Sequence, residues 1–425
     1  MDRAAGEGMR FTDAHSPSAV CTPTRYGILT GRYSWRTHLK SGVLWGYSPS
    51  MIEPGRLTAA ALLREHGYAT ACVGKWHLGL GNDEKADYTK PLHPGPNEQG
   101  FDYFFGIPAS LDMDPYLYIE NDRATSTPSL EIEDSPMPAF YRGGPIAPDF
   151  KHIEVMPKIT EKAVGFIERH AAAATGKPFF LYFPLTAPHT PWLPTDSVKG
   201  ESNAGVYGDF VCLVDRAIGE ILKTLDRYGL SDNTLVIITS DNGADERYLL
   251  PSYRHEANYH FRGQKADIWD GGHRIPFFAR WPGHIKPGTT CAETISLADL
   301  TATCAALVGE DLPDNAAEDS YNILPALLGQ KLDTPIREAT VHHSIEGMFS
   351  IRQGQWKLIL GRGSGGFGWK AEEHMPKPGE PRGQLYNVEE DFAEEHDLYF
   401  NSPEVVEHLT QLLEKYKKQG FSRPM

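Results

Sequence analysis

Three short apolar runs constrain the fold of this chain more than any other feature of its sequence. They are rich in β-branched and aromatic residues, and each ends abruptly in polar residues: Ala69–Val73, Phe179–Phe183 and Leu235–Thr239. Continuous apolar runs of this length are typical of strands buried on both faces, as in a parallel sheet. Helical patterns lie between them, most clearly at 206–225, where apolar residues recur on one stripe. This alternation predicts a doubly wound α/β sheet that collects ligands at the carboxyl ends of its strands.

The rest of the chain divides into a long loop region and a second subdomain. Residues 80–157 are rich in proline, glycine, aspartate and tyrosine and have little periodicity, which is typical of a functional loop in a compact domain. After residue 330 the pattern changes to short strand-like segments and a closing amphipathic helix around 405–416. We therefore expect a catalytic α/β domain at 1–330 and a smaller α+β subdomain at 331–425, formed by an antiparallel sheet and a terminal helix.

Composition excludes several classes of function. The 425 residues carry 41 Lys and Arg against 56 Asp and Glu, and a net charge of −15 is a poor surface for nucleic acid or anionic lipid. An anionic substrate would therefore need a local cationic pocket. The five scattered cysteines do not form the pattern of a disulfide framework. No apolar run is long enough to span a membrane, and residues 1–10 lack the apolar core of a signal peptide.

The first motif that carries chemistry is Cys21-Thr-Pro-Thr-Arg25. Pro23 suits the first turn of a helix, so we expect Cys21 at the amino end of a helix and Arg25 one turn further along the same face. The helix dipole and the guanidinium would both favour an anion at Cys21. Taken alone, the motif also fits a buried structural cysteine beside a surface arginine.

Four further motifs place polar side chains after strands or in glycine-rich turns. They are Gly74-Lys75-Trp76-His77, Ala187-Pro188-His189, Ser240-Asp241-Asn242-Gly243 and Arg262-Gly263-Gln264-Lys265. In an extended chain Lys75 and His77 point the same way, and the prolines on both sides of His189 fix its backbone. Asp241 and Asn242 offer oxygens to a hard cation such as calcium or magnesium. Each motif has an ordinary alternative, namely a surface lysine, a packed loop histidine or a turn. Together they indicate a cationic, metal-assisted pocket for a tetrahedral oxyanion ester.

In combination these motifs resemble the formylglycine-dependent sulfatases of the alkaline-phosphatase superfamily. Cys21-Thr-Pro-Thr-Arg25 and Leu29-Thr-Gly-Arg32 match that family's signature, and the later blocks follow in the family order: 74–79, 187–189, 240–243, 272–276 and 384–387. The resemblance covers nearly the whole chain. It implies an alkaline-phosphatase-like, mixed and mostly parallel sheet flanked by helices, and the activity of an arylsulfatase-like sulfuric ester hydrolase.

The resemblance also implies a mechanism. Cys21 would be oxidised by a separate maturation enzyme to formylglycine, whose hydrate attacks sulfur and then collapses to release inorganic sulfate. Arg25 would hold the formylglycine, while Asp241 and Asn242 would hold one calcium ion. The other positively charged or protonatable groups would act on the ester: Lys75 and Lys265 on the sulfate oxygens, His189 as the acid for the leaving alcohol, and His77 in the collapse step.

One departure from the family pattern concerns the metal site. Family members begin with a strand that ends in adjacent aspartates, and these complete the calcium site. Only twenty residues precede Cys21, and Asp2 and Asp13 are the aspartates among them. Met9-Arg-Phe-Thr-Asp13 is similar to the family's second strand, so we expect that the first strand is missing. Truncation, a divergent metal site and a protein that no longer catalyses each explain this departure.

Three functions remain open at this point. The chain is a sulfatase for a sulfated carbohydrate or aryl ester, a phosphodiesterase or phosphonate hydrolase with the same formylglycine, or a non-catalytic binder of sulfated glycan. The aromatic segments 110–116 and 253–261 are expected to wall the pocket, with Asp112, Tyr116 and His255 as candidate substrate contacts. Family members usually work outside the cytoplasm, so we expect a periplasmic or secreted protein.

Overall fold

The computed structural model describes residues 1–249, 253–368 and 375–424. Its contacts divide the chain into two compact units. The first unit comprises Met1, Leu44–Thr234 and Tyr248–His255. The second unit comprises Asp2–Val43, Leu235–Arg247 and Glu256–Met425. The C-terminal subdomain expected at 331–425 lies inside the second unit, and its boundary stays a prediction.

The first unit is built on a five-stranded sheet in the order β6-β5-β4-β3-β9. The central strand β3 pairs in parallel with both β4 and β9, and all its residues after Ala69 are buried. The other pairings of this sheet are antiparallel, and a separate hairpin joins β7 to β8. The strands of the unit are β3 (Ala69–Lys75), β4 (Tyr103–Ile107), β5 (Ile119–Glu120), β6 (Arg123–Ala124), β7 (Leu130–Ile132), β8 (Gly144–Ile146) and β9 (Phe179–Tyr182). Five of these strands therefore lie in the segment predicted to be a loop at 80–157, all of them short.

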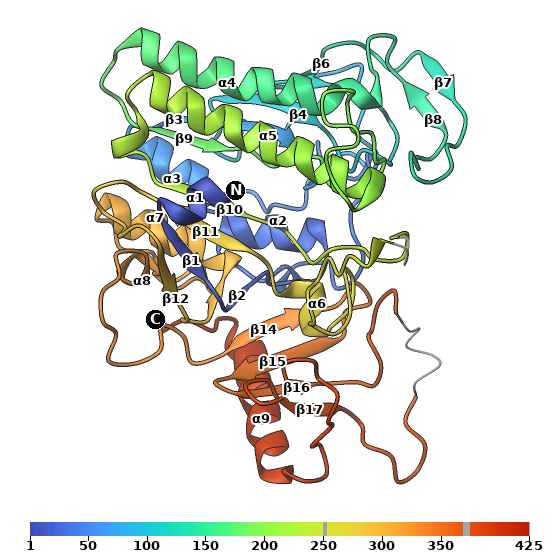
Figure 1. Cartoon of the computed structure of the whole chain (residues 1–425), viewed down its shortest axis with the longest axis vertical. Coiled ribbons are helices and arrows are strands. Elements are labelled where there is room, and N and C mark those ends of the chain that lie inside the picture. Colours follow the sequence, from blue (N-terminus) through green and yellow to red (C-terminus); the bar gives the residue numbers. More distant parts are fainter. Residues whose placement is uncertain (250–252, 369–374, 425) are drawn as a thin grey trace. The chain divides into compact units, whose positions relative to one another are not determined.

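Two long helices lie side by side along this sheet (Figure 1). In α4 the residues Ile159, Ala163 and Ile167 are fully buried, and their spacing of four places them on one stripe that faces β3 and β4. Helix α5 includes residues 206–225, the segment in which the spacing of apolar residues predicted a helix. The helical elements of the unit are α3 (Ala59–Glu65), η2 (His152–Glu154), α4 (Val155–Ala173), α5 (Gly205–Arg227) and η3 (Ser231–Asn233).

The second unit contains a four-stranded mixed sheet in the order β10-β11-β1-β12. Strand β1 is antiparallel to β11 and parallel to β12, and β10 is antiparallel to β11. A short parallel pair joins β13 to β2. The elements of this part are α1 (Asp2–Gly6), β1 (Met9–Phe11), β2 (Ala14–His15), α2 (Cys21–Thr30), η1 (Ser34–Arg36), β10 (Val236–Thr239), α6 (Asp270–His273), β11 (Phe277–Arg280), β12 (Thr289–Cys291), β13 (Ile295–Ser296), η5 (Leu297–Asp299), α7 (Leu300–Val308) and α8 (Leu324–Leu327).

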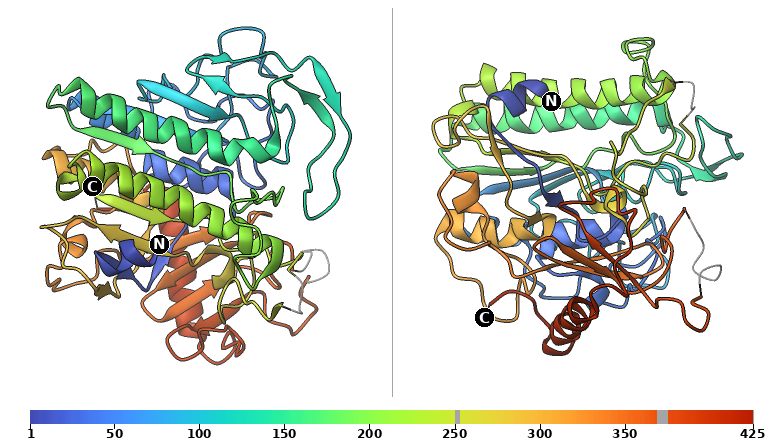
Figure 2. Two further views of the ribbon diagram at one scale, coloured as in Figure 1. Left: turned by 45° about the horizontal axis from the view of Figure 1, so that its top comes forward. Right: turned by 60° about the horizontal axis from the view of Figure 1, so that its bottom comes forward.

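The C-terminal part of the second unit is an antiparallel four-stranded sheet with one helix packed on it (Figure 2). Apolar residues that alternate along the strands, such as Val341, Ile351 and Leu358, form a core with Leu409 and Leu413 of the helix. This arrangement confirms the predicted antiparallel sheet and closing helix. The elements are β14 (Thr340–His343), β15 (Phe349–Gln353), β16 (Trp356–Ile359), β17 (Gln384–Asn387) and α9 (Pro403–Gln419).

The three apolar runs do form strands, but only β3 is buried as the sequence predicted. Every residue of β9 is half-buried, and β10 ends at an exposed Thr239. The physical reason is their place in the sheets: among the described strands, β9 pairs with β3 alone and β10 pairs with β11 alone. Both are edge strands, so the expectation of burial on both faces was wrong for them.

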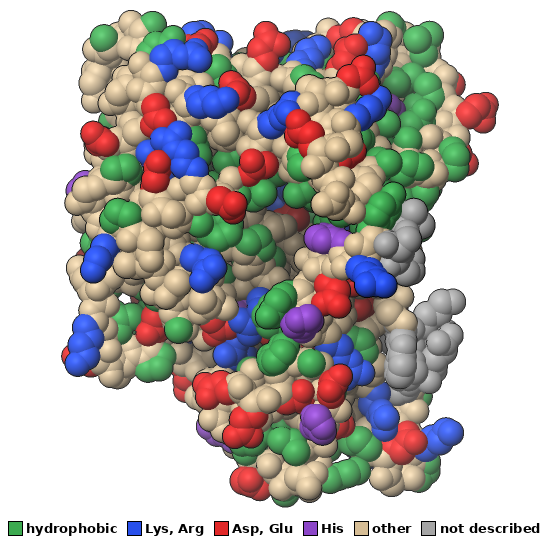
Figure 3. All heavy atoms as spheres, viewed as in Figure 1, with side chains coloured by type: hydrophobic (Ala, Val, Ile, Leu, Met, Phe, Trp, Pro, Cys, Tyr) green, Lys and Arg blue, Asp and Glu red, His purple; other side chains and the backbone are tan. Residues whose placement is uncertain are grey.

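Charged side chains of both signs are interspersed on the face drawn in Figure 3. No broad area of Lys and Arg stands out on that face, which agrees with the net charge of −15. Within the described residues, no helix has the length and apolar character needed to cross a bilayer.

Candidate active site

Cys21 stands at the amino end of α2, as the sequence predicted. It is the first residue of the helix, Val20 before it is extended, and Pro23 lies in the first turn. The cysteine is 3% exposed. Peptide dipoles place partial positive charge at this end of the helix, which favours an anion beside the side chain of residue 21.

Arg25 connects this helix end to the Asp-Asn motif. Its Nη2 atom lies 2.7 Å from Oδ2 of Asp241, and the two side chains are 6% and 21% exposed. Asp241 lies two residues after the end of β10, an extended strand with the sequence Val-Ile-Ile-Thr. The ion pair therefore brings the Cys-x-Pro-x-Arg motif and the Asp-Asn motif into one group within the second unit.

Asn242 carries the oxygen that best fits a cation. Its Nδ2 donates to the carbonyl of Gly243, while its Oδ1 is buried and has no hydrogen-bond partner. An amide oxygen in this state loses its hydration without compensation unless a donor or a cation lies beside it. A neighbouring carboxylate and an unsatisfied amide oxygen are ligands that calcium prefers. Asp241 and Asn242 thus fit a hard divalent ion.

Lys265 lies close to this motif along a well-bonded loop. Its backbone N–H donates to the carbonyl of Ala244 at 2.9 Å, two residues after Asn242. Burial raises the pKa of Asp245, but the hydrogen bond and charge of Arg247, with the charge of Lys265, hold it below its usual value. Lys265 and Arg247 therefore both act as positive charges on the carboxylate of Asp245.

Asn258 holds the loop that carries the metal candidates, and no motif in the sequence points to it. Its Oδ1 accepts from the N–H of Ala244 at 2.7 Å, and its Nδ2 donates to the carbonyl of the same residue at 3.0 Å. This paired contact fixes the backbone after Asn242. Because an asparagine in an irregular segment is common, only the folded chain identifies this role.

In the first unit, Lys75 and His77 are both buried, but the chain between them is not extended. Lys75 ends β3, and its Nζ donates to Oγ of Ser110 at 2.6 Å. His77 has a φ of 60°, which breaks the alternation of a strand, and its Nε2 lies 2.7 Å from the carbonyl oxygen of Leu44. The expectation that both side chains follow one extended segment was therefore wrong.

His189 and Asp112 come together in the first unit, although the sequence placed them in different motifs. Nδ1 of His189 lies 2.9 Å from the carbonyl of Thr190 and 3.7 Å from Oδ1 of Asp112. Asp112 is 5% exposed and forms a 2.6 Å ion pair with Arg142. A carbonyl only accepts, so Nδ1 of the neutral ring carries a proton, and the nearby carboxylate stabilises the doubly protonated ring.

The other two candidate substrate contacts, Tyr116 and His255, differ in burial. Tyr116 is 2% exposed, its ring packs against Phe150 and His152, and its hydroxyl donates to the carbonyl of Arg142. The expectation that Tyr116 walls a pocket does not fit this burial, because both its ring and its hydroxyl are used for packing within the unit. His255 is exposed, with its ring 6.1 Å from that of Tyr207.

His152 next to Tyr116 predicts a pH dependence of stability. Its ring stacks on Tyr141 at 4.2 Å, its Nε2 is buried without a hydrogen-bond partner, and burial lowers its pKa from 6.5 to about 4. The pKa of His152 is lower in the folded protein than in the unfolded chain, so the unfolded chain takes up the proton first as the pH falls. The free energy of unfolding is therefore unaffected by this group above about pH 6.5 and decreases as the pH falls towards 4. We expect a loss of about 2–3 kcal/mol from this group over that range. Urea unfolding at pH 7 and pH 4.5 should show a smaller loss for His152→Phe than for the unchanged protein, and equal losses would contradict the assignment.

Known sulfatases are similar to this chain over most of its length. The sulfatase family model matches residues 1–310. The chain is 35% identical to an N-acetylgalactosamine-6-O-sulfatase of Bacteroides thetaiotaomicron, over 98% of this chain and 88% of that protein. It is 33% identical to arylsulfatase A of Homo sapiens, over 84% of this chain and 68% of that protein. A solved structure from work on glycosaminoglycan metabolism by Bacteroides thetaiotaomicron is similar with a TM-score of 0.86 and 34% identity, over 98% of this chain and 93% of that chain.

Within the second unit, a cysteine at a helix amino end, an arginine one turn on and an Asp-Asn pair after a strand form an arrangement that can bind an oxyanion ester. The family match and the two relatives specify which ester. The chain belongs to the sulfatase family, whose members are sulfuric ester hydrolases.

Proposed function

We propose that this chain hydrolyses the sulfate ester of a sulfated carbohydrate, with a formylglycine made from Cys21 as the nucleophile. The observation that carries the proposal is the 2.7 Å ion pair between Arg25 and Asp241. It joins the modified position, its neighbouring guanidinium and the metal candidates in one unit. Oxidation of Cys21 requires a maturation enzyme as a partner, and the aldehyde hydrate supplies the nucleophilic oxygen.

The metal proposed for this group is calcium, held by Asp241 and Asn242. The fit rests on the unpartnered Oδ1 of Asn242 and on the adjacent carboxylate. When bound, such an ion polarises a sulfate oxygen and favours the ionised nucleophile. The guanidinium of Arg25 adds a fixed positive charge beside the same carboxylate, which lowers the cost of bringing an anionic ester to α2.

The remaining residues have proposed roles that follow their chemistry. The ammonium groups of Lys75 and Lys265 bind sulfate oxygens, and the hydrogen bond to Ser110 fixes the first of them. His189 donates a proton to the leaving alcohol, because Asp112 at 3.7 Å stabilises the protonated imidazole from which that proton comes. His77 assists the step that releases sulfate.

The proposed substrate is an N-acetylgalactosamine 6-sulfate. Support comes from the 35% identity to an N-acetylgalactosamine-6-O-sulfatase over nearly the whole of this chain. Asp112 and the exposed His255 remain candidate contacts to the sugar. Action outside the cytoplasm is part of the same proposal, and fractionation of the source cells tests it.

A substrate panel tests the proposal. The chain is produced together with a formylglycine-generating enzyme. Release of inorganic sulfate is measured with N-acetylgalactosamine 6-sulfate, its 4-sulfate isomer and an aryl sulfate. Hydrolysis of an aryl phosphate diester is measured in parallel, because it is the substrate of the alternative phosphodiesterase activity. We expect the 6-sulfate to be hydrolysed at least about tenfold faster than the 4-sulfate, a difference of about 1.4 kcal/mol in transition-state binding. Faster turnover of the phosphate diester would favour a phosphodiesterase. Sugar binding without sulfate release would identify a non-catalytic binder.

A further inference from the structure

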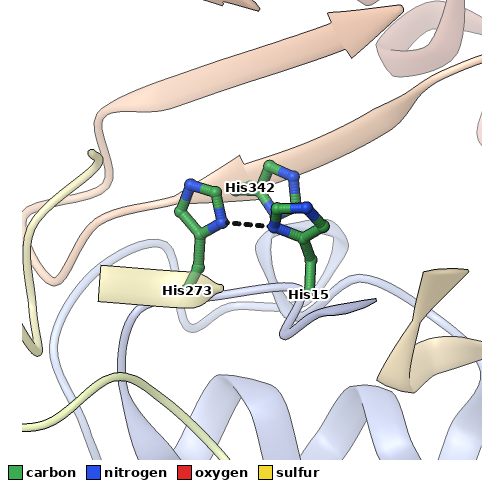
Figure 4. A group of neighbouring side chains, drawn as sticks. All are labelled: His15, His273 and His342. Carbon is green, nitrogen blue, oxygen red and sulfur yellow. Dashed lines mark hydrogen bonds between the residues drawn. The ribbon is translucent and has the colours of Figure 1, made fainter. Parts of the chain in front are cut away.

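Three buried histidines converge within the second unit, and the proposed reaction uses none of them. His15 ends β2, His273 ends α6 and His342 lies in β14 (Figure 4). Their exposed fractions are 0%, 1% and 1%. One ring nitrogen of each lies within 4.8 Å of those of the other two. Three imidazoles from three distant segments therefore meet in a site sealed from solvent.

The hydrogen bonds fix which nitrogens of His15 and His273 carry protons. Nε2 of His15 lies 2.9 Å from the carboxylate of Asp13, which only accepts, and 3.3 Å from Nη1 of Arg352, which only donates. The shorter contact, to the carboxylate, places the proton on Nε2 and leaves Nδ1 bare. Nδ1 of His273 lies 3.0 Å from that bare nitrogen and donates to it (Figure 4). Nε2 of His273 then accepts from the ammonium of Lys357 at 3.1 Å. The carbonyl of Ile268 lies 3.2 Å from the same nitrogen, but a carbonyl only accepts, so it makes no hydrogen bond with Nε2 in this tautomer.

His342 carries an unsatisfied nitrogen. Its Nδ1 lies 3.0 Å from the carbonyl of Ser16, so Nδ1 carries the proton and Nε2 is bare. This Nε2 is buried and has no hydrogen-bond partner. A bare imidazole nitrogen without a donor is costly in the interior, and a metal ion is one group that satisfies it.

Each ring also has the outer contact that metal-binding histidines show. The nitrogen that faces away from the group lies within hydrogen-bond distance of a carboxylate or a carbonyl: Asp13 for His15, Ser16 for His342 and Ile268 for His273. If His273 moves its proton from Nδ1 to Nε2, Nε2 donates to the Ile268 carbonyl and Nδ1 becomes a third bare nitrogen. The ammonium of Lys357, which only donates, then gives up its contact with Nε2 and keeps its two carboxylates, Asp270 and Glu394. That change of tautomer requires no net loss of a proton.

The surrounding charges set which ion suits the group. Three cations near the histidines, Arg274, Arg352 and Lys357, form ion pairs with three carboxylates, those of Asp13, Asp270 and Glu394. With neutral imidazoles, these side chains therefore carry no excess charge. Burial is the largest cause that lowers the pKa of His273 and His342. The carboxylates are already engaged, which leaves nitrogen ligands alone. Such a set favours a late transition ion over calcium or magnesium.

We propose that His15, His273 and His342 form a second metal site, specific for a zinc-like transition ion, that ties β2, α6 and β14 together. The rings of His273 and His342 are stacked at 3.9 Å and 7°, so binding turns one of them about its Cβ–Cγ bond to aim both lone pairs at one ion. The ion replaces the His15–His273 hydrogen bond and satisfies Nε2 of His342. Its effect is on stability, because it joins the segment before Cys21 to the C-terminal sheet.

Cobalt and zinc binding test the site without an activity assay. The full chain is freed of metals, saturated with calcium to fill the oxygen-ligand site, and titrated with Co²⁺ and then Zn²⁺. We expect one equivalent of Co²⁺ to give visible bands of a nitrogen-rich low-coordinate ion, which Zn²⁺ displaces, and X-ray absorption of the zinc form to show three imidazoles. Zinc at 100 times its dissociation constant should raise Tm by about 3 °C.

The matched variants are His342→Gln and His343→Gln, which change adjacent buried histidines of β14. His343 bonds to Ser18 and Ser34 and lies outside the group of three. We expect His342→Gln to lose the cobalt bands and the Tm shift, and His343→Gln to keep both. If His342→Gln does not fold, the zinc X-ray absorption of the unchanged chain decides. No uptake in the presence of calcium, fewer than three imidazoles, or equal uptake by both variants would overturn the proposal.

Discussion

Replacement of Cys21 by alanine is expected to reduce sulfate release at least about 10⁴-fold. Alanine at position 21 lacks the thiol that the maturation enzyme oxidises, so no aldehyde and no aldehyde hydrate can form there to attack sulfur. The change is small, and it sits at the first residue of α2, so the helix and the Arg25–Asp241 ion pair should persist. The measurement is kcat/KM with N-acetylgalactosamine 6-sulfate, together with circular dichroism of both proteins.

Cys304→Ala is the matched control for this change. Cys304 is a buried cysteine of α7 in the same unit, and burial raises its pKa to about 12, so its thiol stays protonated. We expect its removal to lower stability by a few tenths to about 1 kcal/mol and to leave kcat/KM unchanged. Activity retained by Cys21→Ala, or lost equally in both variants, would refute a nucleophilic role for residue 21.

Asp241→Asn should have the second largest effect, a decrease of about 10²–10³-fold in kcat/KM. Asparagine keeps the shape of the side chain but removes the negative charge that pairs with Arg25 at 2.7 Å. It also removes the carboxylate beside the unpartnered oxygen of Asn242, so calcium should bind at least tenfold more weakly. Activity as a function of free calcium, and calcium binding by calorimetry, measure the two effects separately.

Asp232→Asn is the control, because this aspartate is exposed in η3 and is not part of the group around Cys21. It should change neither activity nor calcium affinity. If Asp241→Asn retained full activity with an unchanged calcium requirement, Asp241 would not be a ligand. A loss of activity with calcium affinity unchanged would assign Asp241 to positioning Arg25 alone.

The part of the site that was predictable from sequence is the part held by local structure. Pro23 and the spacing of Cys21 and Arg25 predicted the helix start, and the apolar run before Asp241 predicted the strand that precedes it. The C-terminal sheet and α9 were predictable for the same reason, because alternation and helical periodicity are read within short windows. The contact between Arg25 and Asp241 was not predictable from local patterns, because it joins segments that are far apart in the chain.

Long-range pairing also explains what the sequence analysis missed. Asp13 stood out in the sequence only as one of two aspartates before Cys21, yet it pairs with Arg274 and Arg352, which are distant in sequence. The positions of β9 and β10 at sheet edges depend on strand order, which apolar runs do not encode. The left-handed backbone of His77 and the burial of Tyr116 depend on packing around them, so no local pattern predicted either.

The mass of the tryptic peptide that contains residue 21 tests the central claim most directly. In a preparation that releases sulfate, this peptide should be about 18 Da lighter than its sequence predicts, because the thiol carbon has become an aldehyde. The converted fraction should rise in proportion to specific activity across preparations. Full sulfatase activity in protein whose Cys21 peptide keeps its unmodified mass would contradict the account.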